Sequence, residues 1–359
     1  MRIATVYLGD AIPDYFWANI QYLLSTQDQF SIDIITTQKL TQLPIKSNRL
    51  RNYVYSPELQ ISKLLRRLNL DFKFRDGFWQ YSLERLFALT QYHQELGNES
   101  VLHIESDVLI LPNFPFSEIV KLDKLAWSQV DATRDVASLI FFPTSATSRW
   151  LQSQMTRILQ EVSVIDDMAI LKRISSQFPL EIMNLPTANS MESEILNRDR
   201  AIELPFNLHS GFDKFGGIFD PGSIGIWLTG SEPRNHFGIT RKFDSGELRK
   251  MRLFLDPGLV RYSVSERGHL TYRDGLMEIP IYSLHIHSKN ISYFEKRNLV
   301  KIAEDVKLSR KERIKSNFSI QILLSLLWHN LRKGTLLRYL LWLPLLQRVK
   351  KRVRRTRYK

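Results

Sequence analysis

The stretch VLHIESDVLILPNF, residues 101–114, is the part of the sequence that says most about the fold. Apolar residues surround two carboxylates, Glu105 and Asp107, and Pro112 ends the run. A short apolar run bounded by turn residues predicts one buried strand, residues 101–111, of a parallel sheet. Side chains two positions apart on a strand point to the same face. Both carboxylates are therefore expected on one side, near the carboxyl end of the strand.

Strand-like and helix-like segments alternate on both sides of this stretch. Such alternation predicts an α/β, Rossmann-like fold with a mostly parallel central sheet and helices on both faces. The expected strands are residues 2–8, 31–36, 52–55, 101–111, 126–130, 138–142 and 279–289, and the expected helices are residues 13–26, 57–69, 78–97, 145–161 and 166–177. Residues 205–280 are rich in Gly, Pro and aromatic residues, which favours a loop-rich substrate region.

The composition is that of a folded protein with a sizeable core. The chain has 359 residues, of which 43% are hydrophobic, enough for one large α/β domain or two small ones. It contains no cysteine, which excludes disulfides and cysteine-bound metals. The start, MRIATVYLGD, is typical of a first strand rather than a signal peptide, so we expect a cytoplasmic location, including the cytoplasmic face of the membrane.

Positive charge is concentrated at the C-terminus. Residues 307–359 contain sixteen Lys or Arg and one acidic residue, Glu312, a net charge of +15. Since the whole chain carries +13, the preceding residues carry −2. We therefore predict a nearly neutral body, residues 1–300, and a basic helical tail, residues 301–359.

The tail combines this charge with two Leu/Trp-rich segments, neither of which reaches the roughly 20 apolar residues of a membrane span. Apolar faces, tryptophans and flanking cations are typical of a helix lying on anionic lipid, so an anionic membrane surface is the expected partner. The alternative is that residues 318–343 pack against the body. Nucleic acid is not expected as a partner, because the body carries no excess of positive charge.

The two carboxylates favour a metal site. Burying two unpaired carboxylates together is costly, and Mg²⁺ or Mn²⁺, which prefer oxygen ligands, would remove that cost. The segment SLHIHSKN, residues 283–290, adds His285 and His287 on one face of a second apolar strand, with Lys289 two positions on. Imidazole can bind Mn²⁺, and lysine can neutralise phosphate. The alternatives are a salt-bridged or surface acidic pair, and histidines that only pack and form hydrogen bonds.

A second acidic pair opens the helix in VIDDMAIL, residues 164–171. Asp166 and Asp167 could supply a general base for deprotonating a hydroxyl group. They could equally be an N-cap and a first-turn acid that complement the helix dipole.

Four elements together resemble bacterial nucleotide-sugar glycosyltransferases of the GT-A fold, of the type that builds capsule or lipopolysaccharide. They are Glu105-Ser106-Asp107, similar to the D-x-D element of that family, the helix YSLERLFAL with Arg85, the stretch FDPGSIGIWLTGSEPRN (219–235) and the late HIHSK. The resemblance covers about residues 1–290, and glutamate at the first position of the D-x-D element departs from the usual pattern.

The resemblance implies a catalytic domain over residues 1–300, with a nucleotide-binding half, about 1–115, and an acceptor half, about 116–300. It also implies roles for single residues. Asp107 would be the main metal ligand, completed by a late histidine, for which we choose His287 over His285. Glu105 would contact the ribose of the donor, or the metal through water. Ser288 and Lys289 would meet the diphosphate.

Further roles follow from the same resemblance. Asp220 would bind a sugar hydroxyl, and Gly225 would let the backbone approach the ligand. Arg85 would either meet phosphate or a carboxylate in the core or, as a helix residue, be solvated. Asp167 or Asp166 would act as the catalytic base if the reaction inverts the anomeric configuration of the sugar.

The implied activity is a metal-dependent glycosyltransferase of the hexosyltransferase type, using Mn²⁺ or Mg²⁺. It would move a sugar from a nucleotide-sugar donor to a saccharide or lipid-linked acceptor in cell-surface polysaccharide synthesis, at the inner face of the membrane. One alternative is a sugar nucleotidyltransferase. The segment YLGDAIPDYF (7–16) argues against it, because it contains a single glycine. The other is a non-catalytic membrane- or nucleic-acid-binding protein built on a decayed transferase domain.

Overall fold

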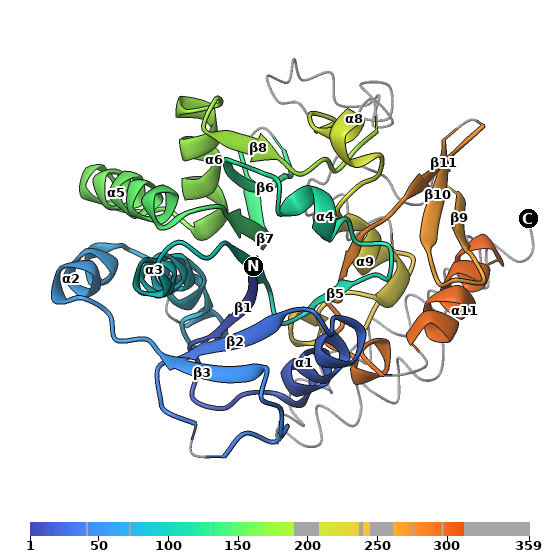
Figure 1. The fold of residues 1–359 in the computed structure, drawn as a ribbon, viewed down its shortest axis with the longest axis horizontal. Helices are drawn as coiled ribbons and strands as arrows, with labels where there is room; N and C mark the ends of the chain where they lie inside the picture. The colour runs from blue at the N-terminus through green and yellow to red at the C-terminus, as the bar shows by residue number, and fades with distance from the viewer. Residues whose placement is uncertain are drawn as a thin grey trace, which may run out of the picture.

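The computed structural model describes residues 1–40, 42–71, 73–131, 133–189, 208–236, 240–244, 261–274, 276–295 and 298–311. Its centre is a seven-stranded sheet with the order β3-β2-β1-β4-β7-β6-β8 (Figure 1). The strands are β1 Arg2–Tyr7, β2 Ser31–Thr36, β3 Leu50–Val54, β4 Val101–Ile104, β6 Leu125–Gln129, β7 Asp135–Phe142 and β8 Ile182–Asn184. β7 runs antiparallel to both of its neighbours, and all the other pairs are parallel.

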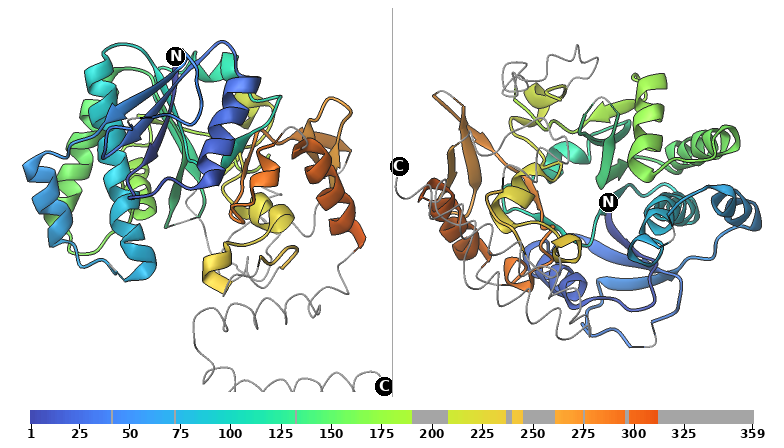
Figure 2. Two further views of the ribbon diagram at one scale, coloured as in Figure 1. Left: turned by 90° about the horizontal axis from the view of Figure 1, so that it is seen from below. Right: turned by 180° about the vertical axis from the view of Figure 1, so that it is seen from behind.

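The central strands are buried on both faces, and their successive side chains build a core on each face of this sheet. Ala4 packs with α3 and α5 on one face, whereas its neighbour Ile3 packs with α1 on the other. Figures 1 and 2 show the same two layers, with α2, α3 and α5 on one side and α1 on the other. The helices of these layers are α1 Asp14–Thr26, α2 Leu59–Arg67, α3 Phe78–Leu96, α4 Phe116–Ile119, α5 Ser145–Glu161 and α6 Asp167–Gln177. The predicted α/β fold class is confirmed.

A third core lies beside the central sheet and includes the later part of the chain (Figure 2). A three-stranded antiparallel sheet, β11-β10-β9, packs there with α9 and α11, next to a ribbon of β12 and β5. The elements are β5 Val108–Ile110, β9 Arg261–Val264, β10 Leu270–Asp274, β11 Met277–Pro280, β12 Ser283–His285, α8 Phe212–Phe215, α9 Ser223–Thr229, α11 Asn298–Lys311, and the 3-10 helices η1 Phe74–Asp76, η2 Pro233–His236 and η3 Ile291–Tyr293.

Two predicted strands are wrong in extent. Residues 101–111 do not form one strand, because β4 pairs within the central sheet while β5 leaves it to pair with β12. Residues 279–289 likewise divide into the end of β11, then β12, then a turn. In both cases, successive parts of one apolar run pair with different neighbours. The region 205–280, predicted to be loop-rich, contains α8, α9, β9, β10 and the whole of β11 within its described residues.

The predicted boundary between body and tail, at residue 300, falls inside α11. Ile302 and Val306 of this helix are buried in the third core. Residues 312–359, which hold most of the predicted tail, lie outside the described part of the chain. Within the described part, no helix combines the length and the apolar character that crossing a bilayer requires.

Candidate functional site

The two carboxylates lie in the turn where the chain leaves the central sheet. β4 ends at Ile104, and the backbone N–H of Val108 donates to the carbonyl of Glu105 across 3.0 Å, closing the turn before β5. Asn19 of α1 donates its side-chain amide to the carbonyls of Ser106 and Val108, at 3.1 and 3.0 Å. The side chain of Asn19 on α1 thus fixes the turn between β4 and β5. This explains how a segment outside regular secondary structure can carry a defined site.

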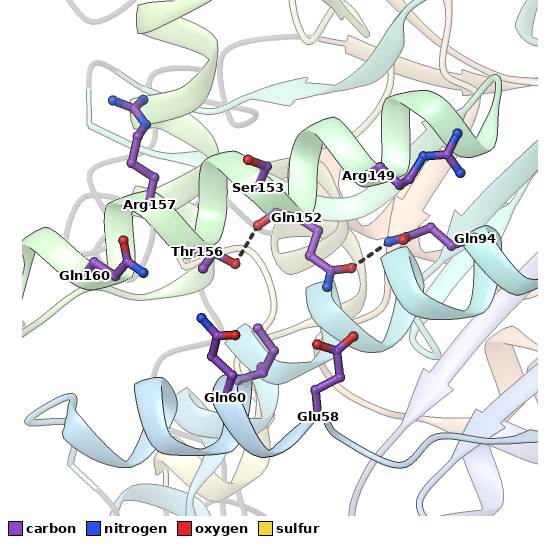
Figure 3. Close-up of a pocket in the computed structure, with 10 residues that line it drawn as sticks. Glu58, Gln60, Gln94, Arg149, Gln152, Ser153, Thr156, Arg157 and Gln160 are labelled. Carbon is purple, nitrogen blue, oxygen red and sulfur yellow. Dashed lines mark hydrogen bonds between the residues drawn. The ribbon is translucent and has the colours of Figure 1, made fainter.

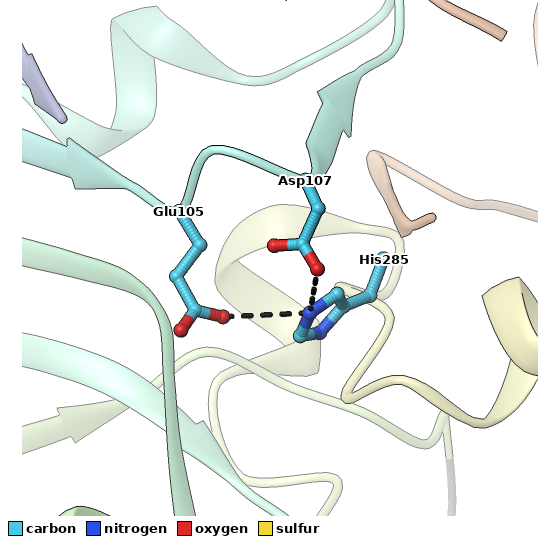
Figure 4. A group of neighbouring side chains, drawn as sticks. All are labelled: Glu105, Asp107 and His285. Atoms are coloured by element: carbon cyan, nitrogen blue, oxygen red, sulfur yellow. Dashed lines mark hydrogen bonds and ion pairs between the residues drawn. The ribbon is translucent and has the colours of Figure 1, made fainter. Parts of the chain in front are cut away.

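Strand pairing brings His285 to these carboxylates. In the antiparallel ribbon His285 is opposite Val108, and the backbone N–H of Ile286 donates to the carbonyl of Asp107 at 2.7 Å. His285 Nε2 lies 3.2 Å from Asp107 Oδ2 and 3.5 Å from Glu105 Oε2 (Figure 4). One ligand atom from each of these three residues lies within 4.8 Å of the others. We call Glu105, Asp107 and His285 the carboxylate–histidine group.

His287, our chosen histidine, is not part of this group. Its ring stacks on that of His285, with centroids 4.1 Å apart and an angle of 25° between the planes. Burial lowers the pKa of His287 well below its ordinary value, and the charge of His285 lowers it further. The structure therefore places His285 against both carboxylates and His287 behind it.

Lys289 reaches the same carboxylate from the turn that follows β12. Its ammonium group forms an ion pair with Asp107, and its nitrogen lies 5.4 Å from the centre of the Tyr15 ring. Burial lowers the pKa of Lys289 to about 7, while Glu105 raises it and two arginines lower it. The neighbouring Ser288 is buried, and its hydroxyl has no hydrogen-bond partner among the described residues.

Arg85 of α3 joins the carboxylate–histidine group to the start of α6. One guanidinium nitrogen pairs with Glu105, and the other lies 2.9 Å from Asp167 Oδ2. Burial disfavours the charge on Glu105, but Arg85 and His285 outweigh this effect and hold its pKa at about 2. Burial also disfavours the charge on Asp167, and here it wins over Arg85, so the pKa rises to about 6. Arg85 thus meets carboxylates in the core, one of the two alternatives predicted for it.

Asp166 is an N-cap. Its carboxylate accepts a hydrogen bond from the backbone N–H of Ala169 at 2.8 Å, at the start of α6. The alternative interpretation of the acidic pair, an N-cap followed by a first-turn acid, thus agrees with the structure, and Asp167 in addition contacts Arg85.

Asp220 differs from its expected role, because its carboxylate is used internally. It is buried and accepts four backbone hydrogen bonds, from Gly222, Ile224, Gly225 and His285, at 2.7–3.0 Å. An ionised carboxylate offers about four acceptor positions, so little capacity is left for a sugar hydroxyl. Asp220 instead fixes the start of α9 and the backbone of His285.

Gly225 lies so close to the backbone of His285 that a residue with a side chain would not fit at this position. A Cβ atom at this position would lie 2.0 Å from the carbonyl oxygen of His285 and 2.8 Å from Asp220 Oδ2. The absence of a side chain therefore lets α9 pack directly on the strand that carries His285.

Asn19 and Tyr15 were missed by the sequence analysis. Asn19 is 2% exposed and lies on the apolar face of α1 beside Phe16, Ile20 and Leu23. A polar residue in that position is the signal that could have identified it, because a buried amide must find hydrogen-bond partners.

A separate polar groove of about 430 Å³ lies between α2, α3 and α5 (Figure 3). It is lined by Glu58, Gln60, Ile61, Gln94, Arg149, Gln152, Ser153, Thr156, Arg157 and Gln160. None of the candidate site residues contributes to it, so we place no part of the chemistry there.

Comparison with known proteins gives only partial structural likenesses. No family model matches the sequence, and no curated protein matches it. A structure of the galactosyltransferase LgtC in complex with donor and acceptor sugar analogs is 13% identical, with a TM-score of 0.39 over 52% of this chain and 73% of that one. The apo form of the glycosyltransferase GlyE from Streptococcus pneumoniae TIGR4 is 13% identical, with a TM-score of 0.30 over 50% of this chain and 44% of that one. Likenesses at this level assign no family to the chain.

Proposed function

We propose that this chain is a metal-dependent glycosyltransferase that takes a sugar from a nucleotide-sugar donor. The observation that carries the proposal is the carboxylate–histidine group, whose ligand atoms lie within 4.8 Å of one another, with the ammonium group of Lys289 on the same aspartate. The sequence elements that resemble GT-A glycosyltransferases, including Glu105-Ser106-Asp107, meet at this group.

The residues fit a divalent cation. Two carboxylates and one imidazole offer oxygen and nitrogen donors without sulfur, a set that suits Mn²⁺ and Mg²⁺. When bound, such an ion supplies positive charge that stabilises the diphosphate leaving group. Asp107, Glu105 and His285 are the residues that would hold it, and His285 takes the place that we predicted for His287.

Other residues of the chain orient and complement this group. Arg85 holds Glu105 ionised and in place, and Asp220 and Gly225 set the backbone position of His285. Lys289 would meet the diphosphate as a point charge, with the Ser288 hydroxyl, which has no hydrogen-bond partner in the described part of the chain, beside it.

Asp167 is the proposed general base for the acceptor hydroxyl group. Burial raises its pKa to about 6, closer to neutrality than an ordinary aspartate, which suits proton transfer near neutral pH. Asp166 is committed to capping α6 and is left out of this role.

The proposed acceptor is a saccharide or a lipid-linked saccharide in cell-surface polysaccharide synthesis. Support comes from the net charge of +15 in residues 307–359, which would hold the enzyme on an anionic membrane surface at its cytoplasmic face.

The proposal predicts that Asp107→Asn removes metal-dependent donor use. We expect the purified wild type, given UDP-, GDP- and CMP-sugars with Mn²⁺, to release nucleotide from one of them and to stop in EDTA. Asp107→Asn should be at least about a hundredfold slower, because it loses a charged group at the site of developing charge. Asp28→Asn, an exposed substitution, is the matched control and should behave as wild type. Equal nucleotide release by Asp107→Asn, or full activity in EDTA, would contradict the proposal.

A further inference from the structure

Three polar side chains from separate segments of the chain meet in the third core. The ammonium group of Lys242 donates to the hydroxyl of Tyr293 at 2.7 Å and to Asp305 Oδ1 at 2.6 Å. The Tyr293 hydroxyl in turn donates to Asp305 Oδ2 at 2.5 Å. Tyr293 and Asp305 are fully buried, and the Lys242 side chain is 27% exposed. We call Lys242, Tyr293 and Asp305 the buried triad.

The buried triad connects residues 240–244, the helix η3 and the helix α11. A fully buried carboxylate is unfavourable unless it is paired. Here both oxygens of Asp305 have partners, and Lys301 of the same helix lies 3.7 Å from its Oδ1. The triad therefore fixes the three segments relative to one another.

The segment between the candidate site and the buried triad is held at both ends. At its start, the backbone N–H of Ile286 donates to the carbonyl of Asp107 at 2.7 Å, and that of Lys289 donates to the carbonyl of Ile286 at 3.0 Å. At its end, the backbone N–H of Tyr293 donates to the carbonyl of Asn290 at 3.2 Å. Lys289 thus lies on a series of turns that begins at the carboxylate–histidine group and ends in the triad.

Two residues with uncommon backbone angles belong to this arrangement. Of the described residues other than glycine, Arg75, Phe243 and Lys289 have a positive φ, which is 55° at both Phe243 and Lys289. Phe243 directly follows Lys242. Such a conformation is unfavourable for a residue with a side chain, and it persists where surrounding contacts enforce it. The contacts at both ends of segment 286–293 supply this constraint for Lys289.

We infer that Tyr293 is a positioning residue, which through the buried triad keeps Lys289 in the conformation that brings its ammonium group to Asp107. The inference rests on the proposed function, in which Lys289 meets the diphosphate of the donor. Without the Tyr293 hydroxyl, η3 loses its hydrogen bonds to α11 and Lys242, and the segment before it can relax toward ordinary backbone angles. The ammonium group is then no longer pre-positioned, so a diphosphate binds more weakly.

The test uses inorganic pyrophosphate with Mn²⁺ as the probe, and isothermal titration calorimetry measures its binding to the full chain. Tyr293→Phe keeps the buried ring and removes only the hydroxyl. We expect it to bind the probe about tenfold more weakly than wild type, the loss typical of one hydrogen bond to a charged group. Lys289→Met should weaken binding at least as much, because it removes the group that is positioned.

Combining the two substitutions distinguishes positioning from a general effect on the fold. If Tyr293 acts through Lys289, the two effects are not additive. Adding Tyr293→Phe to Lys289→Met should therefore weaken binding by less than about twofold, instead of tenfold.

Tyr92→Phe is the matched control. Tyr92 is also a buried tyrosine, and its hydroxyl donates to Asp33 Oδ2 at 2.6 Å, but it lies in a different core. We expect Tyr92→Phe to unfold at a lower urea concentration, as Tyr293→Phe does, and to bind the probe as wild type does. An equal loss of affinity in both variants would indicate a general loosening of the fold and would overturn the inference.

The remaining outcomes separate the inference from the proposed function. If wild type does not bind pyrophosphate with Mn²⁺, or if Lys289→Met binds it as tightly as wild type, the proposed role of Lys289 fails and the inference fails with it. If Lys289→Met binds weakly but Tyr293→Phe binds as wild type does, the inference alone is overturned. The same holds if Tyr293→Phe costs tenfold both with and without Lys289.

Discussion

At the residue scale, two carboxylates that contact the same guanidinium have very different pKa values. Arg85 contacts both Glu105 and Asp167, yet the pKa of Glu105 is held at about 2 and that of Asp167 is raised to about 6. Glu105 also faces His285 and Lys289, which favour its charged form. Asp167 instead has Glu105 and Asp166 nearby, which add to the effect of burial. The surroundings thus keep Glu105 ionised and leave Asp167 able to exchange a proton near pH 6.

This difference predicts how stability depends on pH. Asp167 has a pKa of about 6 in the native state against an ordinary 3.8, so the native state keeps its proton where the unfolded chain has lost it. Its contribution to the free energy of unfolding therefore falls as pH rises from about 4 to about 6, by at most about 3 kcal/mol. Asp167→Asn should lack this contribution, and urea unfolding from pH 4 to 7.5 measures it.

The informative quantity is the difference in the free energy of unfolding between wild type and Asp167→Asn at each pH. We expect the stability of wild type, minus that of Asp167→Asn, to decrease between pH 4 and 6 and then level off. Asp28→Asn should keep the wild-type slope, because its side chain is exposed. A difference that stays constant or grows with pH would show that the carboxyl group of Asp167 is not held in its neutral form.

At the element scale, the site depends on three segments packed backbone to backbone. β5 and β12 pair so that the turn before β5 meets the end of β12, and α9 packs against the backbone of His285. Asp220 joins the last two by accepting hydrogen bonds from both. The backbone of His285, from which the imidazole projects, is therefore positioned by main-chain contacts.

Gly225→Ala tests this packing. The added methyl group would overlap the carbonyl oxygen of His285, so we expect a loss of about 1–3 kcal/mol in the free energy of unfolding. Because the overlap displaces His285, the affinity for Mn²⁺ should fall as well. Urea unfolding and calorimetric titration with Mn²⁺ measure the two effects.

Gly97→Ala is the matched control for this substitution. Gly97 has a φ of 89°, so alanine is strained there too, but the added methyl group would meet open space. We expect it to lower stability and to leave Mn²⁺ affinity unchanged. If Gly225→Ala bound Mn²⁺ as tightly as Gly97→Ala, packing of α9 on His285 would not be what positions the imidazole.

At the scale of the whole molecule, the site lies where the central sheet meets the third core. The carboxylates follow the end of β4 in the central sheet. His285 and Lys289 come from the segment around β12, which packs in the third core. The third core also contains α11, the last described helix (Figure 1).

The proposed role of the tail predicts that a chain ending at Lys311 binds anionic membranes poorly. Basic residues near an anionic surface contribute about 1 kcal/mol each, so their removal should cost at least a hundredfold in affinity for phosphatidylserine vesicles. Co-sedimentation of both chains with these vesicles, and with vesicles of phosphatidylcholine alone, measures the difference. Mn²⁺ affinity serves as the check that the shortened chain is folded. Equal sedimentation of the two chains with phosphatidylserine would contradict the membrane role.

Local pattern was sufficient for much of the fold. The strand predicted at 31–36 and the helix predicted at 145–161 have these bounds in the structure. Both elements have a local signal in the sequence: β2 is a short run whose residues after Ser31 are all buried, and α5 begins with the hydrogen bond from Thr147 N–H to the N-cap Thr144. The importance of Glu105 and Asp107 could also be seen early, because two carboxylates in an apolar run demand an explanation.

By itself, then, the sequence determined the α/β class, the segments that become helices and strands, and the residues from which a site could be made. Only the tertiary structure decided that residues 101–111 divide between two sheets, that His285 rather than His287 faces the carboxylates, and that Asp220 serves the backbone. The physical reason is that hydrophobic periodicity is a property of adjacent residues. Strand partners, register and the hydrogen bonds of a buried side chain depend instead on segments far apart in the chain, which meet only when it folds.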